Sequence, residues 1–248
     1  MAVIHGGPGA PGEMAPVARE LSSVMGVLEP LQTATTLEGQ IRELKAVLKE
    51  SAALPVTLIG FSWGGLLSFI FTARHPSFVR KLILVGSAPY EEKYAVNIMQ
   101  TRLSRLSEAE REQAFSLMRT LNDSSVADKN TPLARPGELL SKADSYDPLP
   151  HDDEILECRY DVFQGVWEQA SELRSSGKLL ELGKSIRVPV VAVHGDYDPH
   201  PSAGVVEPLS RVLKDFRFIL LEKCGHRPWL ERSARDRFYN ILKQELVS

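Results

Sequence analysis

The sequence has few of the features that mark secreted, metal-binding or membrane proteins. It contains only two cysteines, Cys158 and Cys224, which lie far apart without CxxC spacing. A disulfide framework or a cysteine zinc site is therefore not expected, and reduced thiols fit a cytoplasmic protein. No apolar run approaches the roughly 18 residues of a membrane helix. The start, MAVIHGG, also lacks the basic region of a signal peptide.

Charge of one sign is also lacking. The 29 Lys and Arg residues nearly balance the 32 Asp and Glu residues, which gives a net charge of −3. The basic residues are dispersed, so neither nucleic acid nor a membrane surface is expected as a partner. His, Asp and Glu residues show no metal-ligand spacing, and neither a metal nor a cofactor is expected.

The chain does contain a regular alternation of short apolar runs and helical patterns. Near-continuously apolar runs are typical of strands covered on both faces, and they lie at 2–6, 26–32, 56–60, 81–86, 188–195 and 216–222. The helical patterns lie between them at 15–25, 37–52, 64–74, 203–213 and 231–246. This order predicts an α/β fold, doubly wound, with a mostly parallel sheet of about six strands.

The interval 90–185 breaks the alternation. It is polar, mostly helical in pattern, and interrupted by the loop signals TPLARPGE and YDPLPHDDE. The apolar run VPVVAVHG then resumes the sheet. We therefore expect a core built from 1–89 and 186–248, with 90–185 forming a helical cap.

Four segments whose residue types could take part in catalysis or binding follow predicted strands. They are His5-Gly6-Gly7-Pro8-Gly9, the serine of GFSWG, Gly195-Asp196-Tyr197-Asp198-Pro199 and Cys224-Gly225-His226. Ligands of open parallel sheets bind at the carboxyl ends of strands, so these segments are expected to meet at one edge.

These segments also carry a family resemblance. GFSWG matches the G-x-S-x-G nucleophile elbow in its strand-turn-helix context, and Ser62, Asp198 and His226 follow in the order Ser…Asp…His. The sequence resembles α/β-hydrolases over nearly the whole chain apart from the predicted cap. HGGPG together with the elbow and GHRPWLE is most similar to the proline iminopeptidase-like branch.

The resemblance implies a role for each of the three residues. Ser62 would be the nucleophile, and a serine hydroxyl needs a base, for which His226 is the candidate. Asp198 would orient that imidazole and stabilise its charged form. Asp196 is the alternative acid, although it fits a turn residue better.

An oxyanion formed during acyl transfer would need backbone donors. The resemblance implies the amide of Trp63, which follows the nucleophile, and an amide of the glycine-rich turn, for which we expect Gly7. Gly60 and Gly64 would permit the tight turn.

The remaining polar and aromatic candidates have less specific patterns. His5 is expected to support its loop, and His75, His151, His194 and His200 to be surface or packing residues. Iminopeptidases hold the substrate amine with acidic cap residues, and the acids available here are Glu91, Glu92, Asp152, Asp153, Glu154, Glu157 and Glu168. Acids are equally expected on a solvated helix. Trp63, Trp167 and Trp229 could line an acyl pocket, although large aromatic residues are more often core.

The sequence departs from the family at its start. The extra strands before the glycine-rich turn are absent, and the Arg-Gly-rich turn is replaced by EPLQTATT. Residues 26–32 would then form an edge strand, which suits Pro30. Both a natural minimal version and a trimmed start are consistent with this pattern.

The expected function is that of a cofactor-free serine hydrolase acting by acyl transfer on small carboxylic esters or amides. One alternative is an aminopeptidase of the proline iminopeptidase type, with short peptide substrates. Another is a non-catalytic ligand-binding protein on a hydrolase fold. The sequence leaves the oligomeric state open.

Overall fold

A computed structural model describes the chain except for residues 124, 127, 131–138, 152–154 and 248. Its centre is a five-stranded parallel sheet in the order β1-β2-β3-β4-β5. The strands are β1 (Ala2–Ile4), β2 (Val56–Phe61), β3 (Val79–Val85), β4 (Val190–Gly195) and β5 (Phe216–Leu221).

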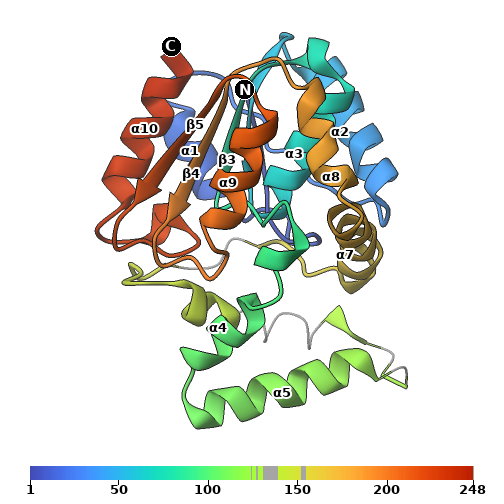
Figure 1. Ribbon diagram of the computed structural model, residues 1–248, viewed down its shortest axis with the longest axis vertical. Coiled ribbons are helices and arrows are strands. Elements are labelled where there is room, and N and C mark those ends of the chain that lie inside the picture. Colours follow the sequence, from blue (N-terminus) through green and yellow to red (C-terminus); the bar gives the residue numbers. More distant parts are fainter. Residues whose placement is uncertain (124, 127, 131–138, 152–154, 248) are drawn as a thin grey trace.

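Helices connect the strands and cover both faces of the sheet (Figure 1). The α-helices are α1 (Ala15–Leu21), α2 (Leu37–Ser51), α3 (Trp63–Arg74), α4 (Ile98–Ser104), α5 (Glu108–Asn122), α7 (Tyr160–Ser175), α8 (Lys178–Leu182), α9 (Ala203–Val212) and α10 (Arg235–Val247). Residues 139–144 are also helical. Short 3-10 turns lie at Pro76–Phe78, Glu92–Tyr94, Gly183–Ser185 and Pro228–Leu230.

The two faces of the sheet have separate apolar cores. Along β3, Leu82 and Leu84 pack with α2, α3, α8 and α9 on one face. Ile83 and Val85 point the other way and pack with α1 and α10. Successive strand side chains point to opposite faces, so the part of β3 that is buried on both, residues 82–85, is apolar throughout, whereas Arg80 and Lys81 near its start are not buried.

The predicted α/β class and parallel sheet are confirmed, but the predicted sixth strand is wrong. Residues 26–32 do not form a strand, and their pairing with the edge of the sheet is an isolated parallel bridge between Leu28 and Ala2. The amide of Val3 donates to the Leu28 carbonyl at 2.9 Å. Pro30 has no N–H to extend this pairing, which gives a physical reason for its ending here.

The helices of the interval 90–185 do not all lie together. In Figure 1, α4 and α5 lie beyond one end of the sheet. Leu103 of α4 packs against a small apolar cluster of Leu106, Ala114 and Ala143, to which α5 contributes Ala114. By contrast, α7 packs on the main core through Val162 and Val166. The division of the chain into a core and a cap remains a prediction.

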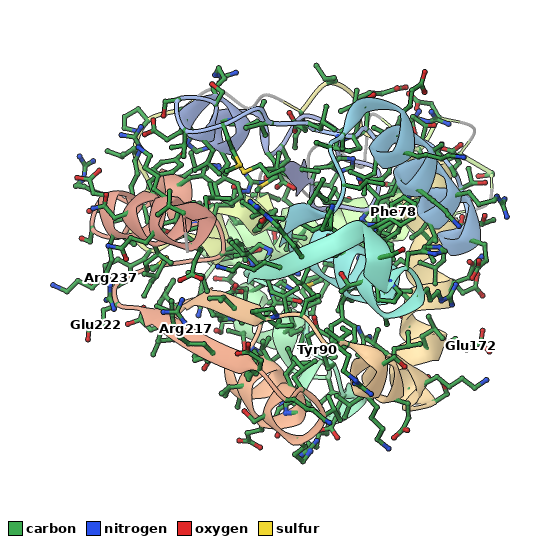
Figure 2. The ribbon with its side chains drawn as sticks, turned by 90° about the horizontal axis from the view of Figure 1, so that it is seen from above. Phe78, Tyr90, Glu172, Arg217, Glu222 and Arg237 are labelled. Carbon is green, nitrogen blue, oxygen red and sulfur yellow. The ribbon has the colours of Figure 1, made fainter. Side chains whose placement is uncertain are left out.

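Many charged side chains lie at the periphery of the layers. Figure 2 shows this for Glu172, Glu222 and Arg237 when the molecule is seen from above. Among the described residues, no helix is long and apolar enough to cross a membrane.

Candidate active site

Ser62 lies on a strained turn between β2 and α3. Its backbone has φ 51° and ψ −115°, a conformation that is rare for a residue with a side chain. Gly64 permits this turn to lie close to β1, because a Cβ there would come within 2.2 Å of the Ile4 carbonyl oxygen. Strained backbone of this kind is concentrated at functional sites.

His226 and Asp198 come together from the loops that follow β5 and β4. The Nδ1 atom of His226 lies 2.7 Å from Oδ2 of Asp198, which is hydrogen-bonding distance. Both residues are buried. Because a carboxylate can only accept, Nδ1 carries the proton and Nε2 of His226 is left as a possible base.

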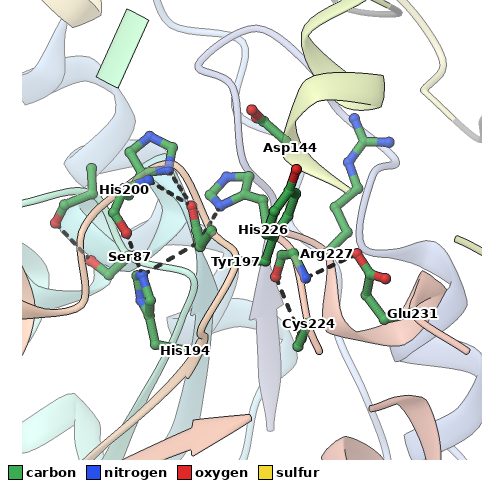
Figure 3. Close-up of polar contacts among 12 residues, drawn as sticks. Ser87, Asp144, His194, Tyr197, His200, Cys224, His226, Arg227 and Glu231 are labelled. Carbon is green, nitrogen blue, oxygen red and sulfur yellow. Dashed lines mark hydrogen bonds and ion pairs between the residues drawn. The ribbon is translucent and has the colours of Figure 1, made fainter. Parts of the chain in front are cut away.

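Two further histidines surround Asp198, and the sequence prediction for them was wrong. His200 lies with its Nδ1 2.8 Å from Oδ1 of Asp198, and its backbone amide donates to the same oxygen at 2.9 Å. Nε2 of His194 is 3.5 Å from Oδ2. Figure 3 shows His194, His200 and His226 grouped around one point. The sequence predicts surface or packing roles for His194 and His200 because it shows no partner for either, and their contacts form only in the folded chain.

This environment decides the charge of the acid. Burial alone would raise the pKa of Asp198, but His226, His194 and His200 outweigh it and hold the pKa well below its ordinary value. Burial lowers the pKa of His200 to about 4, although Asp198 opposes that shift. An ionised carboxylate therefore faces neutral His200 near pH 7.

Among the described residues, one group has the spacing of a possible metal site: Asp198, His200 and His226. Their ligand atoms all lie within 4.8 Å of one another. However, the short contacts from both Nδ1 atoms to the carboxylate are those of hydrogen bonds, which place a proton where a metal ion would have to bind. The geometry fits an acid with two orienting imidazoles better than a metal centre.

Asp196 has a different role from Asp198. Its Oδ1 accepts the backbone amide of Cys224 at 3.1 Å, which ties the loop after β4 to the loop after β5. Burial raises the pKa of the Cys224 thiol, so this cysteine is a poor nucleophile.

Ser62 lines a cavity of about 350 Å³. Its lining is mainly apolar and includes Gly7, Ala88, Met99, Phe163, Trp167 and His200. Two ion pairs also reach it, Arg174 with Glu92 and Arg102 with Asp144. A larger hollow of about 580 Å³, lined by Glu13, Arg227 and Trp229 among others, does not include Ser62.

The two predicted oxyanion donors are residues 7 and 63. Gly7 has φ 101° and lines the same cavity. Trp63 begins α3, where the first amides of a helix have no partner within the helix. Its indole is buried and donates to Oε1 of Gln40 at 2.9 Å, so the side chain belongs to the core.

The other candidates have mixed outcomes. His5 is buried, and its Nε2 accepts the Gln32 amide at 3.2 Å, as expected of a loop support. Trp167 lines the cavity, whereas Trp229 is buried against Phe61. Of the predicted acids, Glu92 lines the cavity, Glu91 pairs with Arg211, and Glu157 and Glu168 are exposed. Asp152, Asp153 and Glu154 lie outside the described residues.

A comparison with known protein families assigns most of the chain. Residues 29–233 match the alpha/beta hydrolase fold family. The chain belongs to this family. The match covers most of the sheet and all of the predicted cap, whereas the likeness to the proline iminopeptidase branch is not supported further.

Among curated proteins, the chain is similar to the pimeloyl-[acyl-carrier protein] methyl ester esterase of Neisseria meningitidis serogroup B. The two are 25% identical over 83% of this chain and 72% of the relative. The protein of the same name from a serogroup A strain is 26% identical over 72% of this chain and 54% of the relative.

Solved structures show the same fold at lower identity. The serine hydrolase CarC of carbazole degradation has a TM-score of 0.63 and 21% identity, covering 99% of this chain and 90% of that one. VinJ has a TM-score of 0.62 and 19% identity, with 99% and 89% coverage. The esterase RhEst1 from Rhodococcus has a TM-score of 0.63 and 17% identity, with 100% and 90% coverage.

Proposed function

We propose that the protein is a serine hydrolase that cleaves carboxylic esters, with Ser62 as nucleophile, His226 as base and Asp198 as acid. The observation that carries this proposal is the strained backbone of Ser62 beside a cavity, together with the Asp198–His226 hydrogen bond at the same end of the sheet. A non-catalytic ligand-binding protein would have no need to keep a nucleophile, a base and an acid together.

The chemistry would proceed in two halves. Ser62 Oγ attacks the ester carbonyl while Nε2 of His226 takes its proton, and the amides of Gly7 and Trp63 hold the resulting oxyanion. The carbon–oxygen bond to the alcohol then breaks, and His226 returns the proton to that oxygen. Water attacks the acyl-serine in the same way, which releases the acid and restores Ser62.

The substrate class rests on the curated relatives and on the lining of the cavity. The relatives are named as methyl ester esterases. A mainly apolar cavity with Phe163, Trp167 and Met99 in its wall suits a short acyl chain. We propose residues 90–185 as the lid over this cavity, because α4 and α7 both contribute to its wall.

The aminopeptidase alternative gains less support from the cavity. Of the predicted acids that the structure describes, Glu92 is the one that lines the cavity. Nε of Arg174 donates a hydrogen bond to Glu92 at 2.8 Å. A substrate ammonium group would have to compete with this guanidinium. Hydrolysis of aminoacyl-arylamides that is lost on N-acetylation would nevertheless favour a peptidase.

Labelling with a fluorophosphonate tests the nucleophile directly. We expect the native protein to react with the probe and to hydrolyse short acyl esters, and Ser62→Ala to do neither while keeping its thermal unfolding temperature. Ser210→Ala, at an exposed serine on α9, is the matched control and should behave as the native protein. Undiminished labelling of Ser62→Ala would refute the assignment.

A further inference from the structure

His200 is a second imidazole on the carboxylate of Asp198. Its ring Nδ1 and its backbone amide both reach Oδ1, at 2.8 and 2.9 Å, whereas His226 takes Oδ2. The mechanism proposed above needs one imidazole on the acid. The second imidazole, that of His200, has no role in that mechanism.

The contact with Asp198 fixes the tautomer of His200. The carboxylate accepts, so Nδ1 must donate, and the neutral ring then has a bare lone pair on Nε2. Among the described residues, none forms a hydrogen bond to this Nε2. His200 is only 5% exposed, so the bare nitrogen is an acceptor that is largely shielded from water.

The position of His200 is also rigidly held. Nε2 of His194 lies 2.8 Å from the backbone carbonyl of His200, and because a carbonyl only accepts, this nitrogen donates. His200 is thus held at its amide, its carbonyl and one ring nitrogen. An acceptor fixed in this way loses little entropy when a ligand binds to it.

The location of the ring indicates which part of a substrate it would meet. His200 lines the cavity that Ser62 lines, and its ring centroid is 4.5 Å from that of His226. Figure 3 shows the two rings next to each other. His226 must deliver its proton to the leaving oxygen, so the part of an ester beside these rings is the alcohol.

We propose that Nε2 of His200 accepts a hydrogen bond from the leaving group, so that the enzyme prefers esters whose alcohol carries a second hydrogen-bond donor such as a hydroxyl. This inference rests on the proposed ester hydrolysis and adds the chemistry of the alcohol. A site built to accept a hydrogen bond discriminates against an analogue that lacks the donor.

Three esters of one short acid test the preference in the native protein. The alcohol is 1,3-propanediol, butanol or 3-methoxypropanol, so that only the first ester carries a hydroxyl donor on the leaving group. We expect kcat/KM to be highest for the hydroxypropyl ester, by roughly threefold to tenfold, as one hydrogen bond of ordinary strength would give. Equal values for the hydroxypropyl and methoxypropyl esters would overturn the proposal.

The His200→Phe variant tests the residue. Its overall activity will fall because Asp198 loses a partner, so the readout is the ratio of kcat/KM for the hydroxypropyl and butyl esters. We expect that ratio to fall to the value set by the intrinsic reactivities of the two esters. His75→Phe, the same substitution at a histidine on the C-terminal end of α3, should keep the native ratio.

Failure of the inference can be told apart from failure of the proposed function. If the native protein hydrolyses all three esters without preference, His200 is not a specificity residue, although the hydrolase assignment stands. If it hydrolyses none and resists fluorophosphonate, both proposals fail. Should His200→Phe not fold, the comparison of the three esters with the native protein still decides.

Discussion

Glu231 accepts the backbone amide of Gly225, the residue before His226, at 2.9 Å through its Oε1. The same oxygen accepts the Tyr146 amide at 2.8 Å, and Oε2 accepts the Asp147 amide at 2.8 Å. Glu231 is 1% exposed. One buried carboxylate therefore joins the loop of the proposed base to a segment of the predicted lid.

Replacing Glu231 with Gln should move that loop. A glutamine keeps one oxygen but presents an NH2 group to at least one of the three backbone donors, which leaves a buried donor unpaired. We expect the free energy of unfolding to fall by about 1 to 3 kcal/mol. We also expect kcat to fall more than KM changes, because the base is displaced. Denaturant unfolding and ester kinetics check both results, and Glu222→Gln, at an exposed carboxylate, should alter neither.

The two aspartates after β4 should differ sharply when each is changed to Asn. Asp198 holds His226, and loss of its charge should lower kcat by roughly a thousandfold or more. Asp196 only accepts the Cys224 amide, which an Asn oxygen can also do, so its loss should cost less than about tenfold. Equal losses in ester hydrolysis would contradict the assignment of Asp198 as the acid.

Gly86, directly after β3, leaves room for the hydrogen-bonded pair of Asp198 and His226. It has φ 48°, and a Cβ there would lie 2.9 Å from the His226 carbonyl oxygen and 3.1 Å from its Nδ1. Gly86→Ala should therefore reduce ester hydrolysis on the order of a hundredfold by displacing the imidazole.

Gly177 is the matched control for backbone strain. It has φ 74°, but a Cβ there would meet nothing within 4 Å. Gly177→Ala should cost about 1 kcal/mol of stability and no activity. Comparable kinetics for the Gly86→Ala and Gly177→Ala variants would show that the contact with His226 is unimportant.

Stability should fall as the pH is lowered from about 6.5, the ordinary histidine value, towards 4. Burial lowers the pKa of His5 and of His200 to about 4, so the unfolded chain binds these two protons first. Each histidine should then reduce the free energy of unfolding by about 3 kcal/mol at most across that range. Asp198, whose pKa is depressed, adds a further loss only below its ordinary range.

Urea unfolding at several pH values between 4.5 and 7.5 measures this dependence. His200→Phe removes one of these groups and should reduce the slope, while His5 retains the rest together with His75, whose pKa is also lowered by burial and by the charge of Lys45. A stability that is constant from pH 7.5 to 4.5 would contradict the buried, neutral state of both histidines.

Local pattern was sufficient for much of the fold. The near-continuously apolar runs at 56–60 and 81–86 predicted β2 and β3, because strand residues buried on both faces of a sheet are mostly apolar. The run at 26–32 looked similar but forms only one bridge, since pairing at a sheet edge depends on which neighbour the chain can reach. An apolar run indicates that a segment is buried, but it does not indicate which segment it forms hydrogen bonds with.

The same limit applies to the candidate site. GFSWG predicted a turn at Ser62, because the glycines and the change from strand to helix pattern are properties of adjacent residues. His194 and His200 gave no signal, since an isolated histidine has the same appearance on a surface and beside a buried acid. Glu231 gave none either, because its three partners come from segments up to 85 residues away.

The sequence by itself determined the strand and helix order, the turn at Ser62 and the expectation that Asp198 and His226 follow strands. These features depend on neighbours along the chain and on the common direction of parallel strands. Only the tertiary structure decided that three histidines share one carboxylate and that Glu231 ties the His226 loop to residues 146 and 147. Such contacts arise where distant loops are pressed together by the packing of the sheet, and their distances are set by that packing.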